Sequence, residues 1–196
     1  MRTAITFFTL TLIVGLLHGQ APTYYYGLNG CDLSEANNGL GDLDTTGNLT
    51  CVCGPIGDGF ELDGNSAIEM PLPGSLLLRD FTLSFYIRPD MRANIQQVMT
   101  NAPVCNARDS LFEIQYFSSL NLISVQLADF GGVRGVVEAP MDDEKCWQQV
   151  TIVREGRLIF LYINGQLGAT FEGDQRIEVN TTRPIMVGSG PCSPVQ

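Results

Sequence analysis

The strongest constraint on the fold is an Asn164-Gly165 pair that lies between two apolar runs. Asn and Gly tolerate the positive φ angles at the two central positions of a type I′ turn, whose twist matches that of paired antiparallel strands. A second turn signal, Glu155-Gly156, precedes the first of these runs. The stretch 147–171 therefore predicts a three-stranded antiparallel meander.

Elsewhere, short segments with alternating side chains are separated by turn residues. The clearest is 81–88, where four apolar residues alternate with Thr, Ser, Tyr and Arg. Period two is the pattern of a half-buried strand, and strands spaced by about 8–12 residues are typical of a sandwich or barrel. We therefore predict an all-β fold, an antiparallel β-sandwich. Besides the meander, strands are expected at 23–28, at 60–62 and 67–70 as a hairpin around Asp63-Gly64, and at 81–88, 96–100, 110–116, 122–127, 133–138, 176–179 and 184–187.

The first twenty residues predict a secretory signal peptide. Arg2 gives a positive start, residues 4–17 are mostly apolar, and the small residues Gly19 and Ala21 follow. This order is typical of a cleavable leader, and the apolar run is shorter than the roughly 20 residues that a membrane-spanning helix needs. We expect removal of 1–20, secretion without membrane insertion, and one extracellular domain at 21–196.

Charge and cysteine content narrow the partners and the compartment. The net charge is −10 with only 11 Lys and Arg residues, which argues against nucleic acid as a partner because its binding rests on phosphate neutralisation. Six cysteines behind a leader indicate three disulfides, for which fifteen pairings exist. We favour Cys31 with Cys51 and leave the pairing of the others open: Cys53, Cys105, Cys146 and Cys192.

Several motifs follow one another along the chain. They are Gly57–Gly64, Phe81–Pro89, the Trp147-x-x-Val150 strand with the later Tyr162-x-Asn164-Gly165 hairpin, and 185–189. In this order they resemble the LamG-like domains of secreted proteins. The resemblance implies a concanavalin A-like jelly roll that binds a ligand more often than it catalyses. Such domains usually continue with one more strand after 185–189, so we expect this chain to lack the last strand, as a partial sequence would.

The spacing of the carboxylates bears on an enzymatic alternative. Glycoside hydrolases of the laminarinase type share the jelly roll, and retaining hydrolysis needs two carboxyl groups about 5–5.5 Å apart on one groove. The nearest match, Glu61-Leu62-Asp63, lacks the second Glu, and Asp63-Gly64 is typical of a turn. The only histidine, His18, lies in the leader. We predict no catalytic residues and no enzyme, with a glycoside hydrolase or lyase of the same fold as the alternative.

Calcium is the one cofactor that the sequence suggests. Carboxylate and amide oxygens in loops suit this hard cation, and the resemblance implies a calcium site that uses the Gly/Asn/Asp-rich leading loop. The candidate ligands are Asp32, Asn38 and Asp42. The alternative is that these residues only form turns, where Asn and Asp are common.

Glycan recognition would require exposed aromatic rings. The candidates by residue type are Tyr86, Tyr116 and Phe130, whereas Trp147 is expected in the core. Because most aromatic residues of a sandwich are buried, each candidate has core packing as its alternative. The sequence thus predicts a secreted, non-catalytic binding or adhesion module for a glycan or an extracellular protein. A structural spacer without a ligand is a further alternative.

Overall fold

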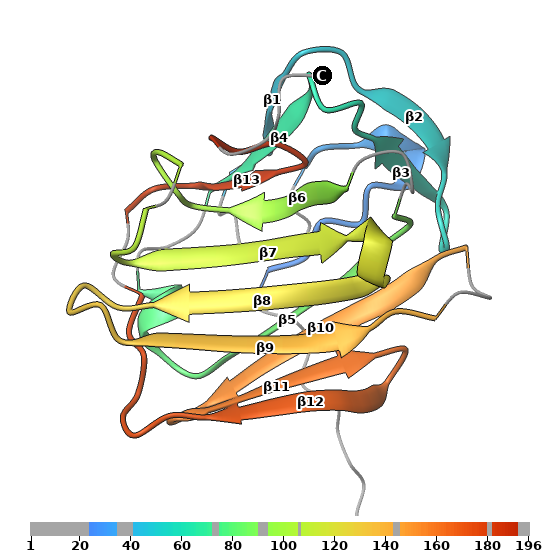
Figure 1. The fold of residues 1–196 in the computed structure, drawn as a ribbon. Coiled ribbons are helices and arrows are strands. Elements are labelled where there is room, and N and C mark those ends of the chain that lie inside the picture. Colours follow the sequence, from blue (N-terminus) through green and yellow to red (C-terminus); the bar gives the residue numbers. More distant parts are fainter. Residues whose placement is uncertain are drawn as a thin grey trace, which may run out of the picture.

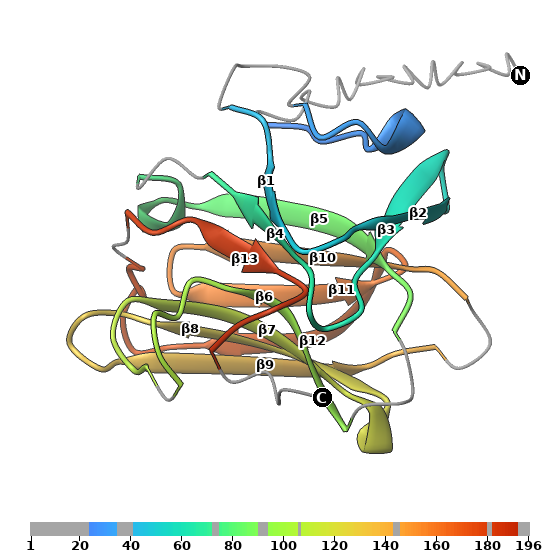
Figure 2. The same cartoon turned by 90° about the horizontal axis from the view of Figure 1, so that it is seen from above.

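The computed structural model describes residues 24–34, 41–71, 75–89, 94–105, 107–142, 146–179 and 182–191. These residues form a sandwich of two antiparallel sheets with a separate two-stranded hairpin (Figures 1 and 2). This confirms the predicted all-β sandwich. Within the described residues, no helix has the length and apolar character needed to cross a membrane.

The smaller sheet contains the predicted meander. Its strand order is β12-β11-β10-β5, with all neighbours antiparallel. Asn164 and Gly165 have φ angles of 52° and 79°, so the turn between β11 and β12 has the predicted positive φ at both positions. The strands are β5 (Phe81–Ile87), β10 (Gln148–Glu155), β11 (Leu158–Ile163) and β12 (Gln166–Glu172).

The larger sheet has seven strands in the order β1-β4-β13-β6-β7-β8-β9. Its later strands lie close to their predicted positions. Their bounds are β1 (Asp44–Thr46), β4 (Ala67–Met70), β6 (Ile95–Thr100), β7 (Leu111–Phe117), β8 (Leu122–Ala128), β9 (Arg134–Pro140) and β13 (Ile185–Val187). Two single-turn 3-10 helices, η2 (Leu76–Leu78) and η3 (Ser118–Leu120), lie between strands.

The core lies between the facing sides of the two sheets. Phe112 and Ile114 of β7 and Val150 and Ile152 of β10 are completely buried. Alternate residues of each strand point to this core because successive side chains of a strand point to opposite faces. The outer face of the seven-stranded sheet is consequently formed by the other residue of each pair, many of them polar.

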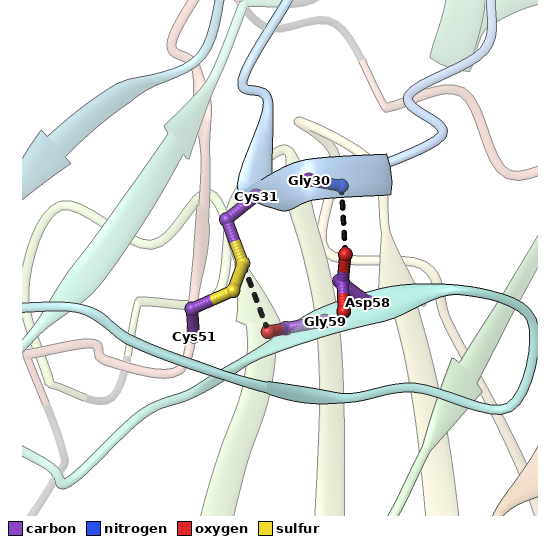
Figure 3. The surroundings of a disulfide bond; sticks show 5 residues. All are labelled: Gly30, Cys31, Cys51, Asp58 and Gly59. Atoms are coloured by element: carbon purple, nitrogen blue, oxygen red, sulfur yellow. Dashed lines mark hydrogen bonds between the residues drawn. A yellow bond between two sulfur atoms is a disulfide. The ribbon is translucent and has the colours of Figure 1, made fainter.

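The hairpin consists of β2 (Thr50–Cys53) and β3 (Asp58–Glu61), and the 3-10 helix η1 (Asn29–Cys31) lies beside it. Figure 3 shows the predicted Cys31–Cys51 disulfide joining η1 to β2. Next to it, the backbone N–H of Gly30 donates to Asp58 Oδ2 at 2.8 Å. We call η1, β2 and β3 the hairpin end of the sandwich; it lies on the right in Figure 1.

Several predicted elements differ from the structure. Tyr24–Leu28 and 176–179 form no strands, whereas β1 and β2 occur in a region expected to be irregular. Residues 60–62 and 67–70 do not form a hairpin, because β3 pairs with β2 while β4 pairs with β1 and β13. The turn between β3 and β4 therefore connects the two-stranded hairpin to the seven-stranded sheet.

The prediction of three disulfides is not met in full. Cys105 is also disulfide-bonded, but Cys53 and Cys146 are free and exposed. Cys53 lies two residues after Cys51 on the same face of β2, and only Cys51 lies opposite Cys31. Cys192, like residues 1–23 with the predicted leader, lies outside the described residues.

Candidate functional site

The three aromatic candidates lie in three different environments. Tyr86 is on the outer face of the four-stranded sheet, with 43% of its surface exposed. Phe130 is on the β8–β9 turn and is 80% exposed. Tyr116 is 1% exposed, and its hydroxyl donates to Asn121 Oδ1 at 2.8 Å. We therefore remove Tyr116 from the candidates, because a ring buried in the core cannot stack on a ligand.

Trp147, which was expected in the core, lies outside it. Its ring lies beside the hairpin end, where a Cβ on Gly59 would be 3.6 Å from a ring carbon. The guanidinium carbon of Arg88 lies 5.4 Å from the ring centroid, a cation–π distance. The ring packs there because β10 begins after Trp147, and Gln148 is the first residue of that strand to face the core.

The calcium candidates are only partly within the described residues. Asp32 is exposed, and its Oδ1 accepts from the backbone N–H of Ser34 at 2.9 Å, a bond that lowers the pKa of Asp32. Asp42 is exposed, and Asn38 lies outside the described residues. Among those residues, no three His, Cys, Asp or Glu side chains form a metal-binding group. Calcium binding stays a prediction.

The carboxylate considered for catalysis holds a turn. Asp63 Oδ1 accepts from the backbone N–H groups of Asn65 and Ser66, each at 2.9 Å, and from Ser66 Oγ at 2.8 Å. The Ser66 hydroxyl, followed by the Asn65 amide, lowers the pKa of Asp63. A carboxyl group that stays ionised and satisfied in this way is poorly suited to donate a proton.

A cleft lies at the end of the sandwich where the β8–β9 turn approaches the chain that leaves β12; we call it the rim cleft. Its volume is about 390 Å³, within the range of about 300–1,000 Å³ that ligand pockets typically have. Figure 1 shows this end on the left, opposite the hairpin end. The lining combines an aromatic ring with charged and amide groups: Val133, Arg134, Phe171, Glu172, Gly173, Asp174 and Gln175.

Two edge strands build the rim cleft, because β9 ends one sheet and β12 ends the other. Gly135 of β9 lacks a side chain, and the neighbouring layer fills that space. A Cβ at Gly135 would lie 2.7 Å from ring carbon Cε1 of Phe171 and from Cδ1 of Ile177. This close approach fixes the Phe171 ring in the lining. The exposed Phe130 lies on the turn three residues before Val133.

Arg134 connects the rim cleft to the outer face of the seven-stranded sheet. Its guanidinium donates to Oε1 of Gln126. Burial raises the pKa of Glu113 on the neighbouring strand, while the charge of Arg134 and a hydrogen bond from Gln97 oppose that rise. Gln115 Nε2 in turn donates to Gln97 Oε1 at 3.2 Å. These side chains form a strip of planar amide, carboxyl and guanidinium groups beside the rim cleft, in which Gln97 is buried.

The other arginines at this end are also occupied. Arg157 forms an ion pair with Glu172 at 2.5 Å, and Arg176 forms one with Asp80 at 3.0 Å. Asp80 Oδ1 also accepts from the backbone N–H of Gly156 at 2.8 Å. The ion pairs tie the chain after β12 to the start of β5 and to the β10–β11 turn.

A buried arginine supports the wall of the rim cleft from inside. Arg154 is 1% exposed; it donates to the carbonyl oxygen of Ile177 at 2.5 Å and to that of Arg79. Its guanidinium carbon lies 5.0 Å from the Phe81 ring centroid. Burial lowers the pKa of Arg154 to about 10, so the group stays charged at neutral pH. It holds 176–179 just beyond the cleft-lining residues.

A comparison of the sequence with known families agrees with this fold. Residues 62–195 match the concanavalin A-like lectin/glucanases superfamily. The chain belongs to this superfamily. No curated protein is similar enough in sequence to count as a relative.

Solved structures with the same fold share little sequence with this superfamily member. Domain 4 of AbnA, a GH43 extracellular arabinanase from Geobacillus stearothermophilus in complex with arabinotriose, matches with a TM-score of 0.61 and 15% identity. The match covers 86% of this chain and 83% of that domain.

Two toxin binding domains match less fully. That of Paraclostridial Mosquitocidal Protein 1 has a TM-score of 0.58 and 17% identity, and the match covers 74% of this chain and 39% of that one. That of Botulinum Neurotoxin DC, in complex with SialylT, has a TM-score of 0.57 and 19% identity, with coverage of 74% and 38%. This chain thus spans less than half of either toxin domain, and the likeness shows a shared fold.

Phe130, which was named from residue type alone, lies on the turn that leads into the rim cleft, and its role in binding stays a prediction. The sequence missed the charged lining. Arg134, Glu172 and Asp174 come from β9, β12 and the segment after β12, and no local pattern links them. The one sequence signal for these lining residues was their position next to predicted turns, at the start of β9 and the end of β12.

Proposed function

We propose that this chain is a secreted, non-catalytic module that binds a glycan at the rim cleft. The observation that carries the proposal is the cleft itself, where Phe171 lies among the hydrogen-bonding groups of Arg134, Glu172, Asp174 and Gln175. A sugar offers hydroxyl groups that both donate and accept, and C–H faces that pack on rings. Shallow sites that combine a ring with a few polar groups suit such a ligand.

The relatives in fold support the same class of ligand. The arabinanase domain was solved with arabinotriose, and the neurotoxin domain with SialylT. Both are described as parts of larger proteins, and neither shares enough sequence to transfer its ligand. They support a binding role for this fold, while the chemistry of the rim cleft identifies the surface.

A non-catalytic role is supported by two carboxyl groups, one that lines the cleft and one that the sequence suggested for catalysis. Glu172 is paired with Arg157, and Asp63, the residue considered for catalysis, lies in a turn beyond β3 with its oxygen occupied. Carboxyl groups that already hold an ion pair or a turn are poorly placed to protonate a leaving group, and Glu113, whose pKa burial raises, is not among the cleft-lining residues. Release of reducing sugar from β-glucans or arabinans would contradict this part of the proposal.

Glycan-array binding followed by calorimetry tests the site. Arg134→Ala should weaken binding of an array hit by about 10- to 100-fold, because hydrogen bonds to charged groups contribute about 1.5–3 kcal/mol. Phe130→Ala should weaken it by about two- to tenfold if the ring stacks on the ligand, since aromatic contacts contribute about 0.5–1.5 kcal/mol. The same titration, repeated with added calcium and with EDTA, tests whether calcium changes the affinity.

Arg88→Ala provides the matched control. This arginine is also exposed and also lies on a sheet end, but beside Trp147 at the opposite end of the sandwich. It should leave affinity unchanged. Equal losses in Arg88→Ala and Arg134→Ala would place the binding surface elsewhere, and the absence of any array hit would favour the spacer alternative.

A further inference from the structure

We infer that the rim cleft selects neutral glycans and discriminates against acidic ones. This inference rests on the proposed function, and it concerns the charge of the ligand. It starts from four arginines at this end of the sandwich, Arg134, Arg154, Arg157 and Arg176, and from what each of them already binds.

Each of these arginines has a partner within the described residues. Arg134 donates to Gln126 and faces Glu113. Arg157 is paired with Glu172, and Arg176 with Asp80. Arg154 is buried against backbone carbonyl oxygens. A sugar carboxylate would therefore have to compete with a protein carboxylate at Arg157 and Arg176, and it could not reach the buried Arg154. Arg134 keeps further N–H donors, and the nearby charge of Glu113 opposes its positive charge.

The carboxylates at the cleft add repulsion to that cost. Glu172 and Asp174 line the cleft directly, and Asp174 forms no ion pair with the described residues. Arg134 is the only cation among the lining residues. Because Arg157 already balances the charge of Glu172, Asp174 is the lining carboxylate that repels an anionic ligand, and the net charge of −10 on the chain acts in the same direction.

Neutral sugars meet no such barrier. Their hydroxyl groups can donate to Glu172 and Asp174 and accept from Arg134 and Gln175 without removing an existing charge partner. The carboxylates are thus useful acceptors for a neutral ligand and an obstacle for an acidic one. The same groups that make the cleft a plausible sugar site therefore determine which sugars it takes.

The test uses matched glycan pairs on one array, each neutral glycan beside the same glycan capped with sialic acid, including lactose and α2,3-sialyllactose. For every neutral glycan that binds, the capped partner should bind about two- to fivefold more weakly, because an unpaired carboxylate about 4–10 Å away repels the added charge. Raising the salt concentration should narrow the gap, since exposed charges are screened.

Two variants sharpen the test. Glu172→Gln removes an anion and also frees Arg157, so it should improve the relative binding of acidic glycans most. Asp174→Asn removes an anion only and should narrow the ratio by about two- to fivefold, the effect expected for one exposed charge at about 4–10 Å in water. Glu61→Gln, at the exposed end of β3, is the matched control and should leave the ratio unchanged.

The outcomes separate this inference from the proposed function. Equal or tighter binding of the capped glycans, with or without added calcium, overturns the charge selectivity and leaves glycan binding intact. Lack of binding to every glycan of the array overturns both. A preference for neutral glycans that survives Glu172→Gln and Asp174→Asn unchanged would also overturn the inference, because the charges would not be its cause.

Discussion

The two ends of the sandwich both hold chain with little regular structure, and they hold it by different means. At the hairpin end, η1 is attached by the Cys31–Cys51 disulfide and by the hydrogen bond from Gly30 to Asp58. At the cleft end, 173–179 is attached by the buried side chains of Arg154, Ile177 and Val179. One end depends on a covalent bond and the other on burial.

The difference follows from exposure. Cys51 is exposed, as is the hydrogen bond between Gly30 and Asp58, so water competes with the non-covalent contacts there and the disulfide must hold the segment. Ile177 and Val179 are 2% and 0% exposed. Burial removes that competition, and hydrogen bonds to the guanidinium of Arg154 then contribute more.

The largest expected effect is at the cleft end. Arg154→Ala should lower the free energy of unfolding by about 2–4 kcal/mol, because the buried carbonyl of Ile177 loses its donor at a cost of about 1–3 kcal/mol and the part-buried carbonyl of Arg79 adds about 1 kcal/mol. Chemical denaturation measures the loss. Arg154→Lys keeps the charge but cannot reach both carbonyls, and it should lie between wild type and Arg154→Ala.

The neighbouring Arg157 supplies the control. It forms an exposed ion pair with Glu172, with side-chain exposures of 57% and 56%, and exposed ion pairs contribute about 0–1 kcal/mol. If Arg157→Ala destabilises the protein as much as Arg154→Ala does, burial is not what holds this end.

At the hairpin end, removal of the disulfide should have a more local effect. In the Cys31→Ser/Cys51→Ser double variant, the free energy of local opening at the hairpin end should fall by about 3 kcal/mol. This is the chain-entropy value for the loop that the disulfide closes, whose ends are 20 residues apart. Hydrogen exchange should rise in η1, β2 and β3 but change little in β7 and β10. Cys53→Ser, which removes an exposed free thiol from the same strand, should change neither.

The sequence indicated the hairpin end better than the cleft end, for a physical reason. A disulfide requires two cysteines, and an even number of cysteines behind a predicted leader indicated disulfides, among which Cys31–Cys51 was the favoured pair. Arg154 gives no such signal. It follows Val150 and Ile152 in the same period-two phase and so faces the core, but its acceptors lie 23 and 75 residues away.

Local periodicity also explains one success and one error. Asn164-Gly165 encodes its turn within two residues, so the meander could be predicted without tertiary contacts. Tyr116 was considered for ligand binding on residue type alone. Its phase with Phe112 and Ile114 already placed it on the apolar face of β7, and the structure shows all three in the core.

The candidate site could not be derived from sequence because it forms where two edge strands meet. Strand order decides that β9 and β12 are both edges, and order depends on pairings between segments far apart in the chain. Motifs therefore identified the superfamily fold, while the charged lining of the rim cleft appeared only in three dimensions.

The smallest expected effects are on the pH dependence of stability, which should have opposite signs for Glu113 near the rim cleft and Asp63 after β3. Burial raises the folded-state pKa of Glu113, beside Arg134, above its unfolded value of about 4.5. The folded protein then binds the extra proton, so the contribution of Glu113 to stability falls as pH rises from the unfolded pKa through the folded one. Glu113→Gln should be more stable than wild type at pH 7 and equal to it near pH 3, by thermal denaturation.

Asp63, in the turn after β3, should behave in the opposite way. Its pKa is lowered from about 3.8 by the hydrogen bonds from Ser66 and Asn65. The stability that these bonds provide is fully present above the unfolded pKa and is lost as pH falls through the lower folded pKa. Asp63→Asn should therefore be less stable than wild type at pH 7, with the difference disappearing near pH 2. If both variants change the stability at pH 7 in the same direction, burial of Glu113 and hydrogen bonding of Asp63 do not have the opposite effects expected here.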